Sequence, residues 1–255
     1  MEAAVALREQ PEIRELFQVL EGNGLKKERQ EVETLVNYLE GMESQFGQVM
    51  KELKEVRGQL EQIQDRGIKA TAARLLDSAE GKVQEIGGQI ALVKTNLVCS
   101  AKNAVYDFKE KGVDALRRAV SAMKIPTALS ALKESLHSGM ESMERNAAKI
   151  GIVGSELNKA AQHTKNAGRA LIGRRTKEPA EPRGDKGVLA KIQKAFLSFG
   201  RSFAAMEKAA GNAQKRMEQF CRGEDKKPSV KAELRQIKRG RNESQKIQPA
   251  REQAR

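Results

Sequence analysis

The chain has 255 residues, of which 39% are apolar, 32% are charged and 4% are aromatic, and its formal net charge is +13. This composition favours an all-α protein, built as an elongated helical bundle or coiled coil, over a fold with a wide compact core. No apolar run approaches the roughly 18 residues of a membrane span, and the first ten residues lack a signal-peptide pattern, so we expect a cytoplasmic protein, with peripheral membrane attachment left open.

The N-terminal segment, residues 1–66, predicts a helical hairpin. Pro11 suits the first turn of a short helix, and Gly22-Asn23-Gly24 is typical of a helix end. The apolar face of this helix consists of Ile13, Leu16, Phe17 and Leu20. We expect it to fold back on the next helix, where Val36, Tyr38 and Met50 broaden the apolar stripe.

That next helix carries the most regular pattern of the chain. Its apolar residues alternate steps of three and four through nearly five heptads, which is typical of a coiled-coil seam. The seam comprises Val32, Leu35, Leu39, Met42, Phe46, Val49, Leu53, Val56, Leu60 and Ile63. Because water disfavours such a stripe, it must pack against another helix, either of this chain or of a partner.

Residues 67–173 predict two further long helices. From Ile86 to Met123 the apolar residues follow an 11-residue repeat, and Gly87-Gly88 suggests a bend within it. The repeat resembles the surface-binding repeats of apolipoproteins, synucleins and lipid-droplet coat proteins, most closely at 109–113, a resemblance that implies lipid binding. The alternative is an ordinary bundle helix with a broad apolar face.

The second of these helices begins near Ile125-Pro126 and runs to about Ile172. Its start is rich in Leu and is expected in the core, whereas its Ala-rich end is expected to pack weakly. The inward-facing residues are Leu129, Leu132, Leu136, Met140, Met143, Ala147, Ile150, Leu157 and Ala161. Small residues at Ala147, Gly151, Ser155 and Gly168 would let another helix approach closely.

A charged linker, residues 174–187, is followed by an amphipathic helix at 188–222, which we expect to be separate from the bundle. Its apolar face contains Phe196, Phe199, Phe203 and Phe220, and we interpret the first three as anchors for a partner. The opposite face carries a cation every seven residues, namely Lys194, Arg201, Lys208 and Lys215, with Arg222 beyond them. These cations are the predicted electrostatic contacts.

Three kinds of partner remain open for this helix. A coiled-coil protein or a second copy would cover the Phe stripe, an anionic membrane would take up the stripe and the cations together, and nucleic acid would bind the cations. The polar, basic tail at 223–255 is expected to be disordered and would add to nucleic-acid binding. It lacks the interleaved aromatic residues on which bases stack.

The sequence provides little support for an enzyme. Its two histidines, His137 and His163, have no second His, Cys or Asp at metal-ligand spacing, and Cys99 and Cys221 are far apart. No phosphate-binding Gly-rich loop is found. We therefore expect no cofactor, no metal and no small-molecule substrate.

As a whole, the chain resembles a group of uncharacterised helical proteins from anaerobic Gram-positive bacteria that are often carried on mobile elements. The resemblance rests on the hairpin opening at 13–24, on the seam that follows it and on the Phe-rich basic helix. That group has no established activity. We therefore expect a non-enzymatic scaffold or adaptor that docks through the Phe-rich basic helix, the alternatives being a nucleic-acid accessory protein or a peripheral membrane protein.

Overall fold

The structure is a computed structural model and describes residues 6–123, 125–176 and 187–221, without the side chain of Cys221. All regular elements within these ranges are helical. They are a short 3₁₀ turn, η1 (Leu7–Glu9), and the helices α1 (Pro11–Gly22), α2 (Lys26–Leu60), α3 (Arg66–Lys111), α4 (Val113–Ser121), α5 (Ile125–Leu171) and α6 (Val188–Cys221). The all-α prediction is confirmed. Most of the predicted linker and all of the predicted tail, 177–186 and 222–255, lie outside the described residues.

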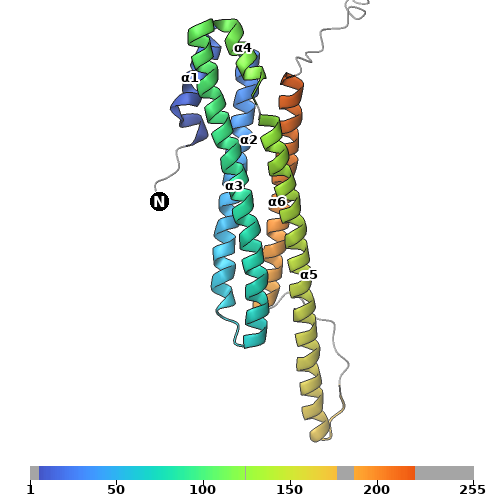
Figure 1. The fold of residues 1–255 in the computed structure, drawn as a ribbon. Coiled ribbons are helices and arrows are strands. Elements are labelled where there is room, and N and C mark those ends of the chain that lie inside the picture. Colours follow the sequence, from blue (N-terminus) through green and yellow to red (C-terminus); the bar gives the residue numbers. More distant parts are fainter. Residues whose placement is uncertain (1–5, 124, 177–186, 222–255) are drawn as a thin grey trace, which may run out of the picture.

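Four long helices form the body of the molecule (Figure 1). Going round the bundle, α2 packs on α3, α3 on α5, α5 on α6, and α6 on α2. Each neighbouring pair runs antiparallel, so the chain goes down, up, down and up in sequence order. This up-down-up-down topology is the usual solution for amphipathic helices joined by short connections.

Other helices of this chain cover the α2 seam. Eight of its ten predicted residues are buried, while Phe46 and Ile63 are half-buried against the same core. The apolar stripes of α3 and α6 lie beside α2 and cover it, so a separate coiled-coil partner is not needed for this surface.

The helix α3 continues unbroken through Gly87-Gly88, where a bend was predicted. A Cβ at Gly87 would lie 2.7 Å from Cζ of Phe46, whereas a Cβ at Gly88 would meet no atom within 4 Å. Gly87 therefore leaves room for a seam ring from α2. Because Gly87 has no side chain, α2 and α3 can pack closely at this position.

The 11-residue repeat was expected to form one helix as far as Met123, and this is wrong. Gly112 has φ 80° and ψ −167°, a backbone conformation that is nearly exclusive to glycine, and it separates α3 from α4. The chain turns at this point, so that α4 packs back on α3, with Leu116 and Val120 fully buried. The later part of the repeat thus belongs to a second, short helix.

The helix α1 lies mainly against α3 and makes fewer contacts with α2, which was its expected partner. Ile13, Leu16 and Leu20 are fully buried in this position. Lys109 of α3 donates to Glu15 of α1 at 2.7 Å. The expected packing of α1 on α2 is therefore present only in part, and α3 is the main partner of α1.

The C-terminal helix is part of the bundle, and the expectation that it is separate is wrong. Phe196, Phe199 and Phe203 have no exposed surface, and the rings of Phe196 and Phe199 meet edge to face with centroids 6.3 Å apart. They fill the core between α6, α5 and α2. Burying three aromatic rings within the chain removes a large apolar area from water, which favours this packing over a detached helix.

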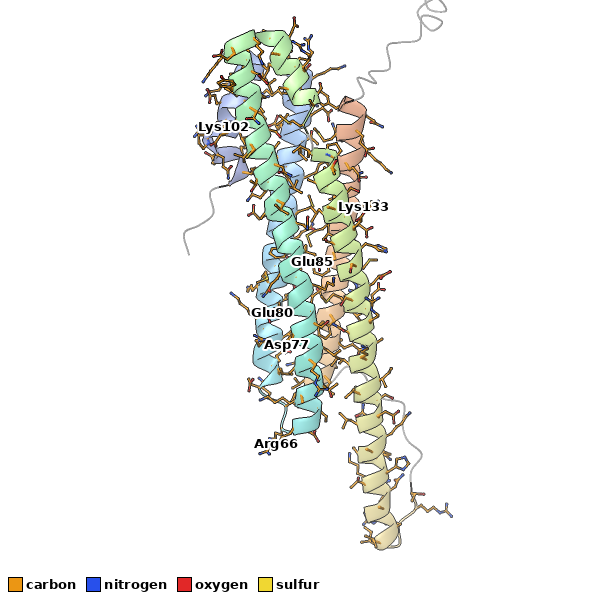
Figure 2. The ribbon with its side chains drawn as sticks, viewed as in Figure 1. Arg66, Asp77, Glu80, Glu85, Lys102 and Lys133 are labelled. Carbon is orange, nitrogen blue, oxygen red and sulfur yellow. The ribbon has the colours of Figure 1, made fainter. Side chains whose placement is uncertain are left out.

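Polar contacts add to the packing at the helix interfaces. Arg57 of α2 bridges Asp77 and Glu80 of α3 at 2.8 and 3.1 Å. Figure 2 labels the two acids on α3. Within α3, the Lys82 ammonium donates to Glu85 at 2.8 Å and, through this hydrogen bond, lowers the pKa of the Glu85 carboxyl. Asn146, which is almost fully buried in α5, donates to the carbonyl oxygen of Leu75 at 3.2 Å and so ties α5 to α3.

Candidate docking site at the open end of the bundle

The helix α5 is longer than the bundle it belongs to. Its last buried residue is Ile150, yet the helix continues to Leu171. We call residues 151–171 the arm, and most of its length extends beyond the other three long helices (Figure 1). With a rise of 1.5 Å per residue the arm is about 31 Å long.

The heptad pattern of α5 continues through the arm. Inside the bundle it includes Ala147 and Ile150, both buried, and beyond them the same three-and-four spacing reaches the end of the helix. We call its six further members the arm seam: Gly154, Leu157, Ala161, Thr164, Gly168 and Leu171. Gly154 and Leu157 are half-buried at the base of the arm, and the other four are exposed.

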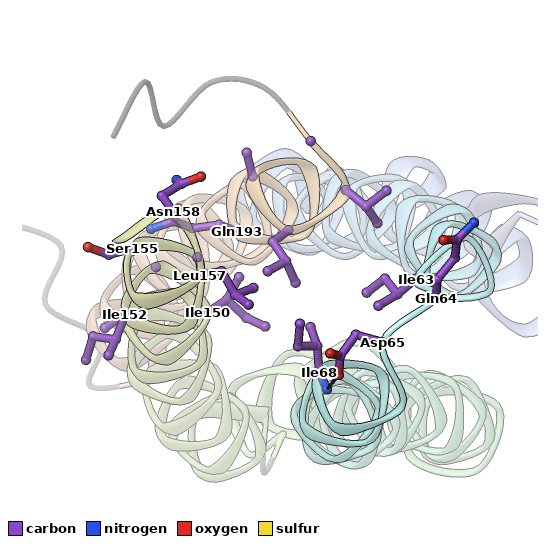
Figure 3. Close-up of a pocket in the computed structure, with 17 residues that line it drawn as sticks. Ile63, Gln64, Asp65, Ile68, Ile150, Ile152, Ser155, Leu157, Asn158 and Gln193 are labelled. Carbon is purple, nitrogen blue, oxygen red and sulfur yellow. Dashed lines mark hydrogen bonds between the residues drawn. The ribbon is translucent and has the colours of Figure 1, made fainter. Parts of the chain in front are cut away.

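A cavity of about 770 Å³ opens at the base of the arm (Figure 3). It lies between α5, the first turn of α6 and the turn that joins α2 to α3. Its apolar walls include Ile63, Ile68, Ile150, Leu157 and Leu189. The bundle core therefore ends in an apolar opening, which we call the open end.

Five polar side chains also line the open end, and local structure fixes two of them. Asp65 caps the start of α3 by accepting hydrogen bonds from the backbone N–H groups of Gly67 and Ile68 at 2.9 and 3.0 Å. Gln193 of α6 lies against α5, since a Cβ at Gly151 would be 2.6 Å from its Nε2 atom. The site thus offers shape and apolar surface, which suits binding of a helix or chain segment.

Charge on the arm lies outside the arm seam. Lys159, Lys165 and Arg169 are opposed by a single acid, Glu156, which accepts from Lys159 at 2.8 Å. The arm is therefore basic around an apolar stripe. At the tip of the arm, Leu171 is 88% exposed, and Ile172, which directly follows the helix, is 66% exposed.

The predicted contacts on α6 lie on two different surfaces. Lys194, Arg201, Lys208 and Lys215 are exposed on the outer face, as the spacing predicts, whereas Phe220 is half-buried against the core. Arg216 turns towards α2 and donates to Glu31 at 3.0 Å, a hydrogen bond that raises the pKa of its guanidinium group. The cations thus lie at the surface, whereas the Phe stripe is packed in the core.

The described residues contain no group of three or more His, Cys, Asp or Glu side chains that would hold a metal ion. His137 lies on the surface, 3.4 Å from Glu207 and 3.5 Å from Glu141, and His163 is exposed on the arm. Among the described helices, none combines the length and apolar content that crossing a bilayer requires.

The sequence reasoning missed the arm as a site. The weakly packing Ala-rich end of this helix and the close approach allowed at Gly168 were recognised, but the open end was not. Its walls come from residues near 63–68, 150–157 and 188–193, which the fold brings together from three segments. The available signal was the continuation of the heptad spacing past Ile150.

The architecture defines a class: a four-helix bundle with one overhanging helix. More specifically, the chain belongs to DUF6674, a family of unknown function whose family model matches residues 9–255. No curated protein and no solved structure matches the chain. The family assignment agrees with the expected resemblance to an uncharacterised group and supplies no activity.

Proposed function

We propose that this protein is a non-enzymatic scaffold or adaptor of the cytoplasm that docks through its arm and the open end of its bundle. The observation that carries the proposal is the arm seam. The heptad pattern continues for six positions beyond the last buried residue of α5, and the last four of them, Ala161, Thr164, Gly168 and Leu171, are exposed. Exposed contiguous apolar surface with a polar rim is typical of interaction sites.

Helix energetics support the same proposal. A single helix of about 20 residues is only marginally stable in water, and most helical stability in proteins comes from packing of an amphipathic face. The arm has such a face, and the packing that would stabilise it is supplied by a docked helix. The four-helix body then acts as a rigid spacer that positions the arm.

Photo-crosslinking in the cell that makes the protein tests this function. A diazirine side chain is placed at Ala161 in the arm seam or at Ala170, which is also exposed but lies on the opposite face of the same helix. We expect a covalent adduct with a protein from position 161 and not from position 170. Equal labelling from both positions, or none from 161, contradicts the proposal.

A second candidate function is docking on a polyanion such as nucleic acid, in the setting of a bacterial mobile element. It is favoured by the α6 cations, since Arg201, Lys208 and Lys215 are exposed and make no ion pair with the described residues. Helix geometry separates successive members by about 10.5 Å. Membrane insertion of α6 is disfavoured, because its Phe face would have to leave the core.

Fluorescence anisotropy with a labelled DNA or RNA duplex tests the second candidate. We expect binding that weakens with salt and is lost when Arg201, Lys208 and Lys215 are all changed to Glu. A chain ending at residue 222 separates these cations from the basic tail. Binding that survives the triple change but not the truncation would assign the affinity to the tail.

A further inference from the structure

We propose that the partner of the arm is the arm of a second copy of this chain, paired antiparallel. This inference rests on the proposed docking function and names its partner. The arm seam is self-complementary: glycine or alanine occupies every first position, and a larger residue, Leu157, Thr164 or Leu171, occupies every second one. In an antiparallel helix pair, first positions of one helix face second positions of the other.

One register pairs the whole arm seam. With the two-fold axis between residues 162 and 163, Gly154 faces Leu171 of the other copy, Leu157 faces Gly168, and Ala161 faces Thr164. Each layer then combines one small residue, Gly or Ala, with one larger residue, Leu or Thr. A parallel pair would instead set Leu against Leu and Gly against Gly, leaving alternate layers crowded and empty, which lowers packing density and stability.

The structure leaves room for this approach. A Cβ at Gly154 or Gly168 would meet no atom within 4 Å, so both positions are open to a neighbouring helix. The pairing also continues an interface that already exists, since Ala147 and Ile150 of the same heptad pattern are packed inside the bundle. The lysines and Arg169 lie beside the arm seam and stay in water.

The open end receives the tip of the other arm in this register. Leu171 of one copy reaches the level of Gly154 in the other, and Ile172 follows it. The cavity of about 770 Å³ at that level is bounded by Ile63, Ile68 and Leu189. Leu171, the most exposed large apolar residue of the described chain, is thereby covered by the opening in the core, and by symmetry this happens twice in the dimer.

Light scattering on the full chain at about 100 µM tests the pairing, because self-association depends on concentration. We expect a mass about twice 28.2 kDa. Ala161→Glu places a charge in the central layer and is expected to weaken association more than about tenfold, whereas Ala170→Glu, on the opposite face, leaves the mass unchanged. Both positions are exposed in the single chain, so both variants keep the fold.

Disulfide trapping tests the direction of pairing. In a Cys99→Ser, Cys221→Ser background, copies carrying Leu157→Cys are mixed with copies carrying Gly168→Cys and oxidised. The antiparallel register predicts a bond between positions 157 and 168 of different copies and none between two copies of 157, which lie about 16 Å apart along the axis. A bond between two copies of 157 would overturn the antiparallel arrangement.

The outcomes for function and partner are distinguishable. A chain that remains monomeric at this concentration, with position 161 crosslinked to a different protein in the cell, overturns the second copy as partner and leaves the docking function standing. A monomeric chain with no adduct at 161 overturns both. A dimer that is insensitive to Ala161→Glu also overturns the proposed interface.

Discussion

Gly139 lies where α5 packs closely against both α3 and α6. A Cβ at this position of α5 would lie 2.7 Å from Cδ1 of Ile86 in α3 and 3.1 Å from Cδ2 of Phe203 in α6. We expect Gly139→Val to lower the free energy of unfolding by about 1–3 kcal/mol through overpacking. Urea denaturation followed by circular dichroism measures this. The matched control is Gly88→Val, a site with open space where the change is expected to be close to neutral.

The Phe residues of α6 stabilise the core of the bundle. Phe199 is fully buried, so we expect Phe199→Ala to cost about 3–5 kcal/mol and Phe199→Asp to abolish cooperative unfolding. Leu197, two residues away and 37% exposed, provides the control, because Leu197→Asp stays near the surface. A soluble Phe199→Asp variant with an unchanged melting curve would mean that α6 does not pack as described.

At the scale of helices, Gly112 makes the corner between α3 and α4. Its φ of 80° with ψ of −167° is strained for any residue with a side chain, so Gly112→Ala is expected to lower stability by about 1–3 kcal/mol. Gly58→Ala, in an open position within α2, should instead raise stability by up to about 1 kcal/mol. Chemical denaturation of both variants compares them, and equal effects would argue against the corner.

The sequence predicted helix faces better than it predicted their partners. The spacing of Leu35, Leu39 and Leu53 identified a buried stripe, and that of Phe196 and Phe203 identified another, because periodicity follows from helix geometry alone. Which stripe covers which depends on the order of helices around the bundle, and local spacing holds no information on this order. The two stripes were therefore read as separate interaction surfaces, although each contributes to the same core.

Glycines were the other weak point of the sequence reasoning. Gly87 was interpreted as a source of bending, whereas it makes room for the ring of Phe46. Gly112 was placed inside a continuous repeat, whereas it ends a helix. A glycine has the same sequence signature whether it allows a close contact, takes up a positive φ or does neither. Only the tertiary structure distinguishes these roles.

At the scale of the whole molecule, the bundle should be stable without the arm. In α5 no residue beyond Ile150 is buried, and Gln193 of α6 lies beside Gly151, so a short loop can join α5 to α6. We expect replacement of residues 159–185 by about four Gly and Ser residues to leave the melting temperature of dilute protein within about 2 °C. A much larger decrease would place the arm among the elements that stabilise the fold.

Salt should act in opposite directions on the two proposed interactions. The paired arms bring like charges together, because each arm has a net positive charge, with Lys159, Lys165 and Arg169 opposed by Glu156 alone. Raising the ionic strength from about 0.05 to 0.5 M screens this repulsion and should strengthen the dimer, as measured by light scattering. Binding of a polyanion by the α6 cations should weaken over the same range. A dimer that dissociates in salt would contradict apolar arm pairing.

The ring of helices also sets the order in which the molecule can fold. The α2–α3 and α5–α6 pairs each join neighbours in sequence, but α6 meets α2 across the whole chain, and Arg216 contacts Glu31 across 185 positions. Contacts between such distant residues form late, because closing a long loop costs entropy before any contact forms. During synthesis, part of the apolar α2 seam therefore stays exposed to solvent until α6 has left the ribosome and can pack on it. A ribosome-bound chain is thus most exposed to aggregation, and most dependent on chaperones, just before α6 emerges.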